Sequence, residues 1–412
     1  MSMHKFPEIK TVLASYFEQF YDDNVLINGT SPNMQLFIDN TEEEKANKEY
    51  WMQNFLVDDL PTPMPSDSDN DAPYAVESAV RKMASMMDWA SPHSETNQRA
   101  KGGHRKHAST IPRFNVGDLQ TAMSLKKLKA LAERYGNDEK VMELYKNGVG
   151  DGIDAGHFAL NRMAADSMST GFIHGWGLLA PTTPLSHGMY PDQFITPKVD
   201  LQDVDTKLIE WIVEFVEQLN STFSTKYNWV IQAADTWVKD VFIVNKETRA
   251  IIAGWKARQD GNPIIMVNND STQVDLAALS TVTVEDAIKW SQSEESTIPP
   301  IEIQIEAQNE DLNGAVTTGR GWNVNNIAFK PVGMSGVIKW TDIPEMALIQ
   351  EFGAPNVPST FAYALGGIVG IINSVVPVGK LADYHQEFYM GARPQLTDFA
   401  YRYIVYTDKT KA

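Results

Sequence analysis

Histidine and cysteine are the side chains that most often hold a metal ion or serve as a nucleophile, and this chain uses them sparingly. Its 412 residues include eight histidines and no cysteine, which excludes disulfides, thiolate metal sites and cysteine nucleophiles together. His104 and His107 lie in a basic segment beside glycines, without the further ligands that a zinc site needs. His157 has no carboxylate four residues away on its expected helix. We therefore expect no metal site and no cofactor.

Three short motifs resemble known sites, and each departs from the pattern that its chemistry requires. The glycines within 148–152 suggest a phosphate loop, but no strand precedes them and no Lys-Ser pair follows. The aspartates within 67–71 suggest a calcium loop, but Ala72 and Ser78 replace the glycine and the glutamate of an EF-hand. Segment 333–336 has its second glycine one place too early for a nucleophile elbow. These departures, and carboxylates that form no obvious pair, predict that the chain is not an enzyme.

The charge balance limits the kinds of partner. The formal net charge is −18, from 53 acidic and 35 basic residues, so the general surface would repel nucleic-acid phosphates. A protein that encloses DNA without adhering to it can be acidic. The composition, 43% hydrophobic and 10% aromatic, is typical of a folded globular chain rather than a disordered one.

The N-terminal third of the chain predicts a helix followed by a long excursion from the main body. An apolar stripe that includes Phe17 and Phe20 has helical spacing and needs a surface to pack on, in its own domain or in a neighbouring subunit. Between residues 57 and 113 there is little sustained apolar periodicity. Leu60–Pro73 is rich in proline and aspartate, and Arg99–His107 is basic and contains two adjacent glycines.

The rest of the chain predicts a mixture of helices and strands. One helical pattern begins at Asp118. Two others cover His157–Thr170, with Gly171 as the stop, and Leu201–Leu219. Short apolar or alternating runs predict strands, with a hairpin at Asn313-Gly314. The expected strands are Trp229–Ile231, Ile264–Val267, Ile301–Ile305, Val324–Lys330, Gly336–Trp340 and Tyr401–Tyr406. Phe361–Val378 carries no charge, but its glycines and proline favour strand-turn-strand over a membrane helix.

The order of these segments, from about Asp118 to the C-terminus, resembles the lambda-type family of phage major capsid protein E. The matching stretches follow the family's order of spine-helix end, outgoing strand, next helix, and axial strand with its helix: Ala164–Gly171, Phe172–Thr196, Val199–Leu219 and Tyr227–Asn245. Within Pro300–Pro344, an alternating strand, a polar turn, Trp322–Pro331 and the glycines of 333–336 also follow the family's order. One departure is Leu201-Gln202-Asp203, where the family often has tryptophan with Ser-Asp.

The resemblance implies an α+β chain of the Hong Kong 97-type major capsid protein fold. Its parts would be an N-terminal arm, an extended loop laid across a neighbour, a peripheral domain with a spine helix, and an axial domain. The expected boundaries are 1–56 for the arm, 57–117 for the extended loop, 118–225 for the peripheral domain, 226–378 for the axial domain, and 379–412 for the return to the peripheral domain.

The function that the resemblance implies is that of a tailed-bacteriophage major capsid protein, assembling in the host cytoplasm as hexamers and pentamers into an icosahedral virion shell around double-stranded DNA. Its partners would be other copies of itself and the portal, scaffold and decoration proteins of the same virus, with no membrane and no sequence-specific DNA binding. An encapsulin-like compartment shell, another virion protein and a soluble α/β enzyme are the alternatives. The candidate subunit contacts are Phe17, Phe20, Arg99, Lys101, Arg105 and Lys106. The basic segment would meet an acidic neighbour, or else be a solvated tip.

Overall fold

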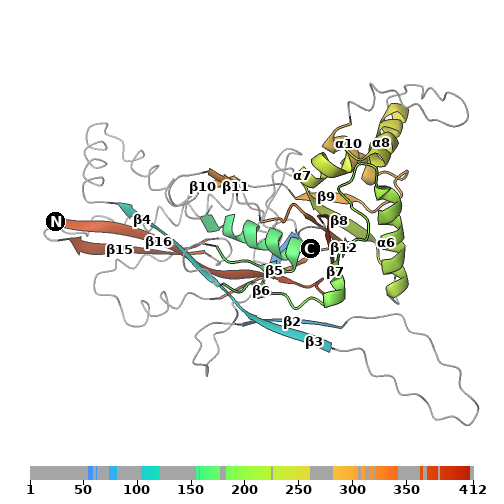
Figure 1. Ribbon diagram of the computed structural model, residues 1–412. Helices are drawn as coiled ribbons and strands as arrows, with labels where there is room; N and C mark the ends of the chain where they lie inside the picture. Colours follow the sequence, from blue (N-terminus) through green and yellow to red (C-terminus); the bar gives the residue numbers. More distant parts are fainter. Residues whose placement is uncertain are drawn as a thin grey trace, which may run out of the picture. The chain divides into compact units, whose positions relative to one another are not determined.

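The structure is a computed structural model of the whole chain, and it describes about half of the residues. The described residues are 54–58, 62, 74–80, 104–120, 155–156, 158–176, 182–223, 226–259, 282–304, 308–310, 316–318, 321–341, 362–364, 369–378 and 381–408. They form a mixed α+β fold, as the sequence predicts (Figure 1). The chain divides into two compact units, one comprising Met1–Ala75, Ala108–Ala164 and Gly336–Gln395, the other Val76–His107, Ala165–Ser335 and Leu396–Ala412.

A five-stranded sheet in the order β7-β17-β12-β8-β9 is the centre of the second unit. Its strands are β7 (Phe194–Ile195), β17 (Tyr403–Tyr406), β12 (Asn326–Pro331), β8 (Trp229–Ala234) and β9 (Ile301–Gln304). The central strand β12 is antiparallel to both of its neighbours, whereas the edge strands β7 and β9 are parallel to theirs. Every residue of β8 is buried, which explains its continuous apolar run rather than an alternation.

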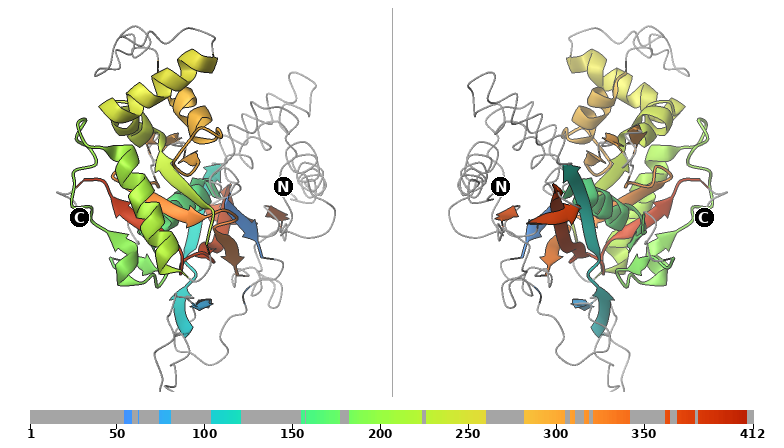
Figure 2. Two further views of the ribbon diagram at one scale, coloured as in Figure 1. Left: turned by 90° about the vertical axis from the view of Figure 1, so that its right-hand side faces the viewer. Right: turned by 90° about the vertical axis from the view of Figure 1, so that its left-hand side faces the viewer.

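The two faces of this sheet are different. Helix α6 (Leu208–Thr222) covers one face (Figure 2). On this face the Phe215 ring lies 4.9 Å from the Phe329 ring and 6.2 Å from the Tyr403 ring, between centroids. On β12, Asn326 lies an odd number of residues from Phe329 and therefore points to the opposite face. There it bonds to the end of a helix that runs over 158–170. One face is thus aromatic, and the other is polar beneath a helix terminus.

Parallel strands cannot be joined by a tight turn and need a crossover connection, usually through a helix; β8 and β9 are joined by such a helical connection. The chain passes from β8 through α7 (Asp235–Trp237), the π-helical turn η3 (Val238–Phe242), α8 (Lys246–Gln259) and α10 (Val284–Ser291). Trp237, Phe242 and Trp290 form a buried aromatic cluster between these helices. The Lys256–Asp286 ion pair, at 2.6 Å, also joins α8 to α10.

The first unit contains a second sheet, in the order β1-β13-β16-β15-β14, with β4 also paired to β16. These strands are β1 (Phe55–Val57), β13 (Gly336–Trp340), β16 (Leu381–Leu396), β15 (Val369–Val378), β14 (Ala362–Ala364) and β4 (Arg113–Gln120). Asp58 extends the β1–β13 contact, because its backbone NH donates to Ile338, its carbonyl accepts from the Trp340 indole, and its carboxylate pairs with Lys339.

Three small two-stranded sheets complete the described strands. β2 (Tyr74–Val80) pairs with β3 (His104–Thr110), β5 (Phe172–Ile173) with β6 (Leu185–Ser186), and β10 (Gln308–Glu310) with β11 (Val316–Thr318). The β10–β11 pair is antiparallel and flanks Asn313-Gly314, so the predicted hairpin is confirmed. The alternating strand before it, β9, pairs with β8 in parallel and takes no part in this hairpin.

Two predicted helix starts are wrong. Asp118 lies in strand β4, opposite Gln386 of β16, so cross-strand pairing overrides the local helical spacing there. Helix α6 begins at Leu208 rather than Leu201, because the carboxylates of Asp200 and Asp203 bond backbone NH groups two residues ahead and form turns.

Other predictions agree with the structure or lie outside it. The helix over 158–170 ends before Gly171 as expected, and strands occupy most of 362–378. None of the helices in the described residues is long and apolar enough to cross a membrane. The predicted strand Ile264–Val267 lies outside the described residues. The division of the chain into arm, extended loop, peripheral domain and axial domain stays a prediction.

Close packing at Gly336 generates a stability prediction. A Cβ atom there would lie 2.0 Å from the Gln395 carbonyl oxygen, which is backbone and cannot move aside. Gly336→Ala should therefore lower the free energy of unfolding by at least about 1–3 kcal/mol in urea titrations followed by circular dichroism. Gly254→Ala is the matched control, because that site in α8 has only the Arg258 side chain 3.9 Å away. The control should be neutral or stabilising by up to about 1 kcal/mol, and equal losses in both variants would contradict the packing argument.

Candidate functional site

The predicted subunit contacts fall mostly outside the described residues. Phe17, Phe20, Arg99 and Lys101 lie outside them. The structure places Arg105 and Lys106 on strand β3, within the two-stranded sheet β2–β3, and describes only their backbone. Their role as contact residues therefore stays a prediction.

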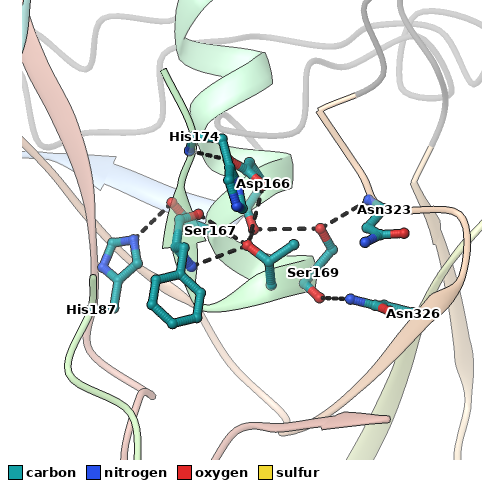
Figure 3. A network of polar contacts seen from close by, with 9 residues as sticks. Asp166, Ser167, Ser169, His174, His187, Asn323 and Asn326 are labelled. Carbon is teal, nitrogen blue, oxygen red and sulfur yellow. Dashed lines mark hydrogen bonds and ion pairs between the residues drawn. The ribbon is translucent and has the colours of Figure 1, made fainter. Parts of the chain in front are cut away.

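A network of polar contacts surrounds the end of the helix over 158–170 (Figure 3). Gly171 ends this helix in the left-handed conformation, with φ of 74°, and donates its NH to the Ser167 carbonyl. The carboxylate of Asp166 turns back over the terminus and accepts from the backbone NH of His174 at 2.5 Å and from its Nδ1 at 2.9 Å. The Asp166 hydrogen bond raises the pKa of His174 above its ordinary value.

A second histidine and two asparagines hold the same terminus. His187 is fully buried and contacts the Ser167 hydroxyl through Nε2 at 2.9 Å. The Ser169 hydroxyl accepts from the backbone NH of Asn323, and the Ser169 carbonyl accepts from the Asn326 amide at 2.8 Å. The last carbonyls of a helix lack partners within the helix, so the Asn326 bond satisfies a backbone group that would otherwise be unpaired.

This cluster contains the residue types of a hydrolase triad in a different arrangement. In a triad, one carboxylate orients a histidine, and that same histidine activates a hydroxyl. Here Asp166 holds His174, whereas the Ser167 hydroxyl contacts a different histidine, His187. One pair fixes His174 to the helix end and the other fixes His187, so the geometry favours a structural role. Among the described residues, no group of three or more His, Asp or Glu side chains is placed to hold a metal ion.

Arg402 is the buried centre of the polar face. Its guanidinium is fully buried and donates through every nitrogen, to Asp398 from Nε at 3.1 Å and Nη2 at 2.6 Å, and to Ser335 from Nη2 at 2.7 Å. Nη1 donates to the Met168 carbonyl at 3.1 Å and to the Gln232 side chain at 2.9 Å. These five bonds match the five N–H donors of arginine. The positive charge also lies at a helix C-terminus, where the backbone dipole favours it.

Lys330 of β12 is a second buried cation, on the same polar face of the sheet as Arg402. Lys330 is 2% exposed, donates to the Gly333 carbonyl at 2.5 Å, and lies 4.0 Å from the Glu302 carboxylate. Burial lowers the pKa of Lys330, and the positive charge of Arg402 adds to this effect. Glu302 also accepts from Gln232, so the two cations share one polar layer on the sheet.

Arg402 lies within Tyr401–Tyr406, which the sequence predicts only as a strand, so its buried role was not predicted. Two signals were present: a charge inside an aromatic run, and an acidic residue four positions earlier, at Asp398. Neither signal names the other partners, Gln232 and Ser335, which are 170 and 67 residues away along the chain. Only the assembled sheet brings them to the guanidinium.

No family model matches the sequence, and no curated protein matches it. Among solved structures, the chain is similar to a prophage capsid protein from E. coli CFT073, with a TM-score of 0.48 and 11% identity over 96% of this chain and 98% of that one. It is similar to the capsid of cyanophage A-1(L), with a TM-score of 0.44 and 12% identity over 91% and 98%. It is also similar to the SrpI encapsulin of Synechococcus elongatus PCC 7942, with a TM-score of 0.33 and 10% identity over 93% and 92%.

The Arg402 network predicts a large stability loss on truncation. Arg402→Met leaves the Asp398 carboxylate buried without its cation, so the free energy of unfolding should fall by about 3–5 kcal/mol in urea titrations. Arg258→Met is the matched control, because its ion pair with Glu295 is exposed to solvent and contributes at most about 1 kcal/mol. Adding Asp398→Leu to Arg402→Met should recover part of the loss. A loss in Arg402→Met no larger than in the control would contradict the network.

The Asp166–His174 pair predicts a pH-dependent term in stability. Because the pKa of His174 is raised in the folded chain, the stabilisation is fully present below pH 6.5 and is lost as pH rises through the folded value. His174→Gln should therefore destabilise the chain more at pH 5.5 than at pH 8.5, measured by urea unfolding at both values. If His174→Gln lowers the free energy of unfolding equally at both pH values, the pair with Asp166 does not stabilise protonated His174 more than neutral His174.

Proposed function

We propose that this chain is the major capsid protein of a tailed bacteriophage, with a Hong Kong 97-type fold, and that it assembles as hexamers and pentamers into an icosahedral shell around double-stranded DNA. The proposal rests first on the order of segments that resemble phage capsid proteins. The structure has a helix ending at Gly171, strand β8 followed by helices, and strand β12 followed by the glycine turn of 333–336, in that order. This order supports the proposal without naming a particular phage family.

The observation that carries the proposal furthest is the two-stranded sheet β2–β3. It lies within the range 57–117 in which an extended loop is expected, and in the described residues its strands pair only with each other. An isolated two-stranded ribbon is marginally stable in water, and it gains stability when another surface covers it. A neighbouring subunit would provide that surface, and repeated contacts of this kind around symmetry axes build closed shells.

Charge fits the same arrangement. In the proposal, the net charge of −18 limits adhesion of the shell to packaged DNA, because acidic residues repel phosphates. In the proposal, the basic residues Arg99, Lys101, Arg105 and Lys106 contact an acidic part of a neighbouring subunit, where opposite charges steer docking and fix register. The N-terminal Phe17 and Phe20 would pack on a neighbour as part of the arm. An encapsulin-like compartment shell is the second candidate, because it would show the same self-assembly.

Replacing the β2–β3 ribbon should separate folding from assembly. Three residues that flank the replaced segment bond to the second sheet and are kept in the variant. Asp58 and Thr62 bond to strand β13, and the Thr110 carbonyl accepts from Arg393 of β16. A variant with a short Gly-Ser linker in place of Val76–His107 should keep the helical circular-dichroism signal of the wild type. In light scattering it should remain as small species under conditions where the wild type forms capsomers or shells.

A full-length variant tests the basic residues within the same assay. Reversing Arg99, Lys101, Arg105 and Lys106 to glutamate should slow or block assembly and leave the thermal melting temperature nearly unchanged. Normal assembly of both variants would contradict the proposed role of the ribbon. If the charge-reversed shells form normally but retain less DNA, the basic residues belong to a DNA contact instead.

A further inference from the structure

The turn that follows strand β12 exposes two large apolar side chains. Val332 is 63% exposed, more than any other large hydrophobic residue among those described, and Met334 is 41% exposed. Single exposed hydrophobic residues are common and need no explanation. Here two of them flank one glycine, Gly333, whose surroundings are open: a Cβ atom there would meet nothing within 4 Å.

The structure holds this turn firmly from beneath. The backbone NH of Val332 donates to the Asn228 carbonyl at 2.8 Å, which extends the β8–β12 pairing by one residue. The buried Lys330 ammonium donates to the Gly333 carbonyl. Ser335 accepts from Arg402 through its hydroxyl and from the Thr397 NH through its carbonyl. Lys330 therefore fixes the backbone of the turn at Gly333 and Arg402 fixes the Ser335 side chain, while the side chains of Val332 and Met334 remain exposed.

Such an arrangement is favourable for binding. A contact residue that is already fixed before binding loses less conformational entropy on docking than a residue on a mobile loop. Apolar anchors of this kind, at the centre of a contact and surrounded by polar residues, contribute most of the binding energy in protein interfaces. Polar neighbours are provided by the exposed Asn228, whose carbonyl bonds to Val332, and by the exposed Lys226 two residues before it.

The charge around the turn indicates what partner it fits. From Leu312 to Thr341 the chain has no aspartate or glutamate, although the whole sequence has 53 of them among 412 residues. Beneath the turn, the buried cations Lys330 and Arg402 face the carboxylates of Glu302 and Asp398. Lys226 adds an exposed positive charge two residues from Asn228, whose carbonyl holds Val332. Two copies of a chain with net charge −18 repel each other over most of their surfaces, so a neutral or basic apolar site is where an acidic copy can approach closely.

We propose that the Val332–Met334 turn is a preformed anchor that docks on a second copy of this chain. The inference rests on the proposed self-assembly and names a contact within it that is separate from the β2–β3 ribbon. If the receiving surface is a different part of the neighbouring copy, the contact is heterologous, which is the geometry that generates rings.

The first test removes the apolar side chains and leaves the turn backbone. Val332→Ser combined with Met334→Ser should raise the protein concentration needed for assembly by about tenfold or more in light scattering, with the thermal melting temperature unchanged. Val199→Ser is the matched control, since Val199 is 43% exposed and lies elsewhere on the same unit. The control should assemble like the wild type. Unchanged assembly of the double variant, or an equal defect in the control, would overturn the proposal.

The second test uses the absence of cysteine in the chain. Met334→Cys introduces a unique thiol, which can carry a maleimide-benzophenone photo-cross-linker. Irradiation of the assembled protein should give a covalent dimer on a denaturing gel, and mass spectrometry of its peptides would identify the receiving surface. Cross-links only within one chain, or none, would overturn the docking of the turn even if the protein assembles. If wild-type protein does not assemble at all, the proposed function fails and the contact fails with it.

Discussion

The buried guanidinium of Arg402 fixes four segments of the second unit that are far apart in the sequence. It joins the helix end at Met168, strand β8 at Gln232, the turn at Ser335 and the C-terminal segment at Asp398. A fully buried charge is tolerated only when all of its donors have partners, and here all five do. The helix-end cluster around Asp166 and the conformation of the 332–335 turn both depend on the position of these segments.

This rigid centre contrasts with the parts of the chain that are proposed to meet other subunits. The β2–β3 ribbon has no third strand among the described residues, whereas the Val332–Met334 turn is exposed but held in place by Lys330 and Arg402. The two features suit different roles in a shell. A ribbon can adapt to a neighbour as it is covered, while a fixed apolar turn can define where a neighbour sits. The acidic surface limits unspecific association between copies.

The sequence predicted the elements whose signals are local. Gly171 marks the helix end because glycine adopts the left-handed conformation found there without strain, and the apolar runs of β8 and β12 mark buried strands. It failed where distant partners decide, as at Asp118, which pairs with β16 from more than 250 residues away. Arg402 was missed for the same reason. For the predicted contact residues, the sequence could not identify the surface that they bind, because charge and apolar spacing indicate a segment able to bind without indicating its partner.

Electron microscopy of the purified, full-length wild-type protein tests the central claim most directly. The proposal predicts capsomers, sheets or closed icosahedral shells across a range of protein concentration and salt. A compartment shell would give closed particles as well, and neighbouring terminase and portal genes would then identify the viral case. A uniformly monomeric protein at every concentration and salt tested, with and without a scaffold protein, would contradict the account and favour a soluble enzyme instead.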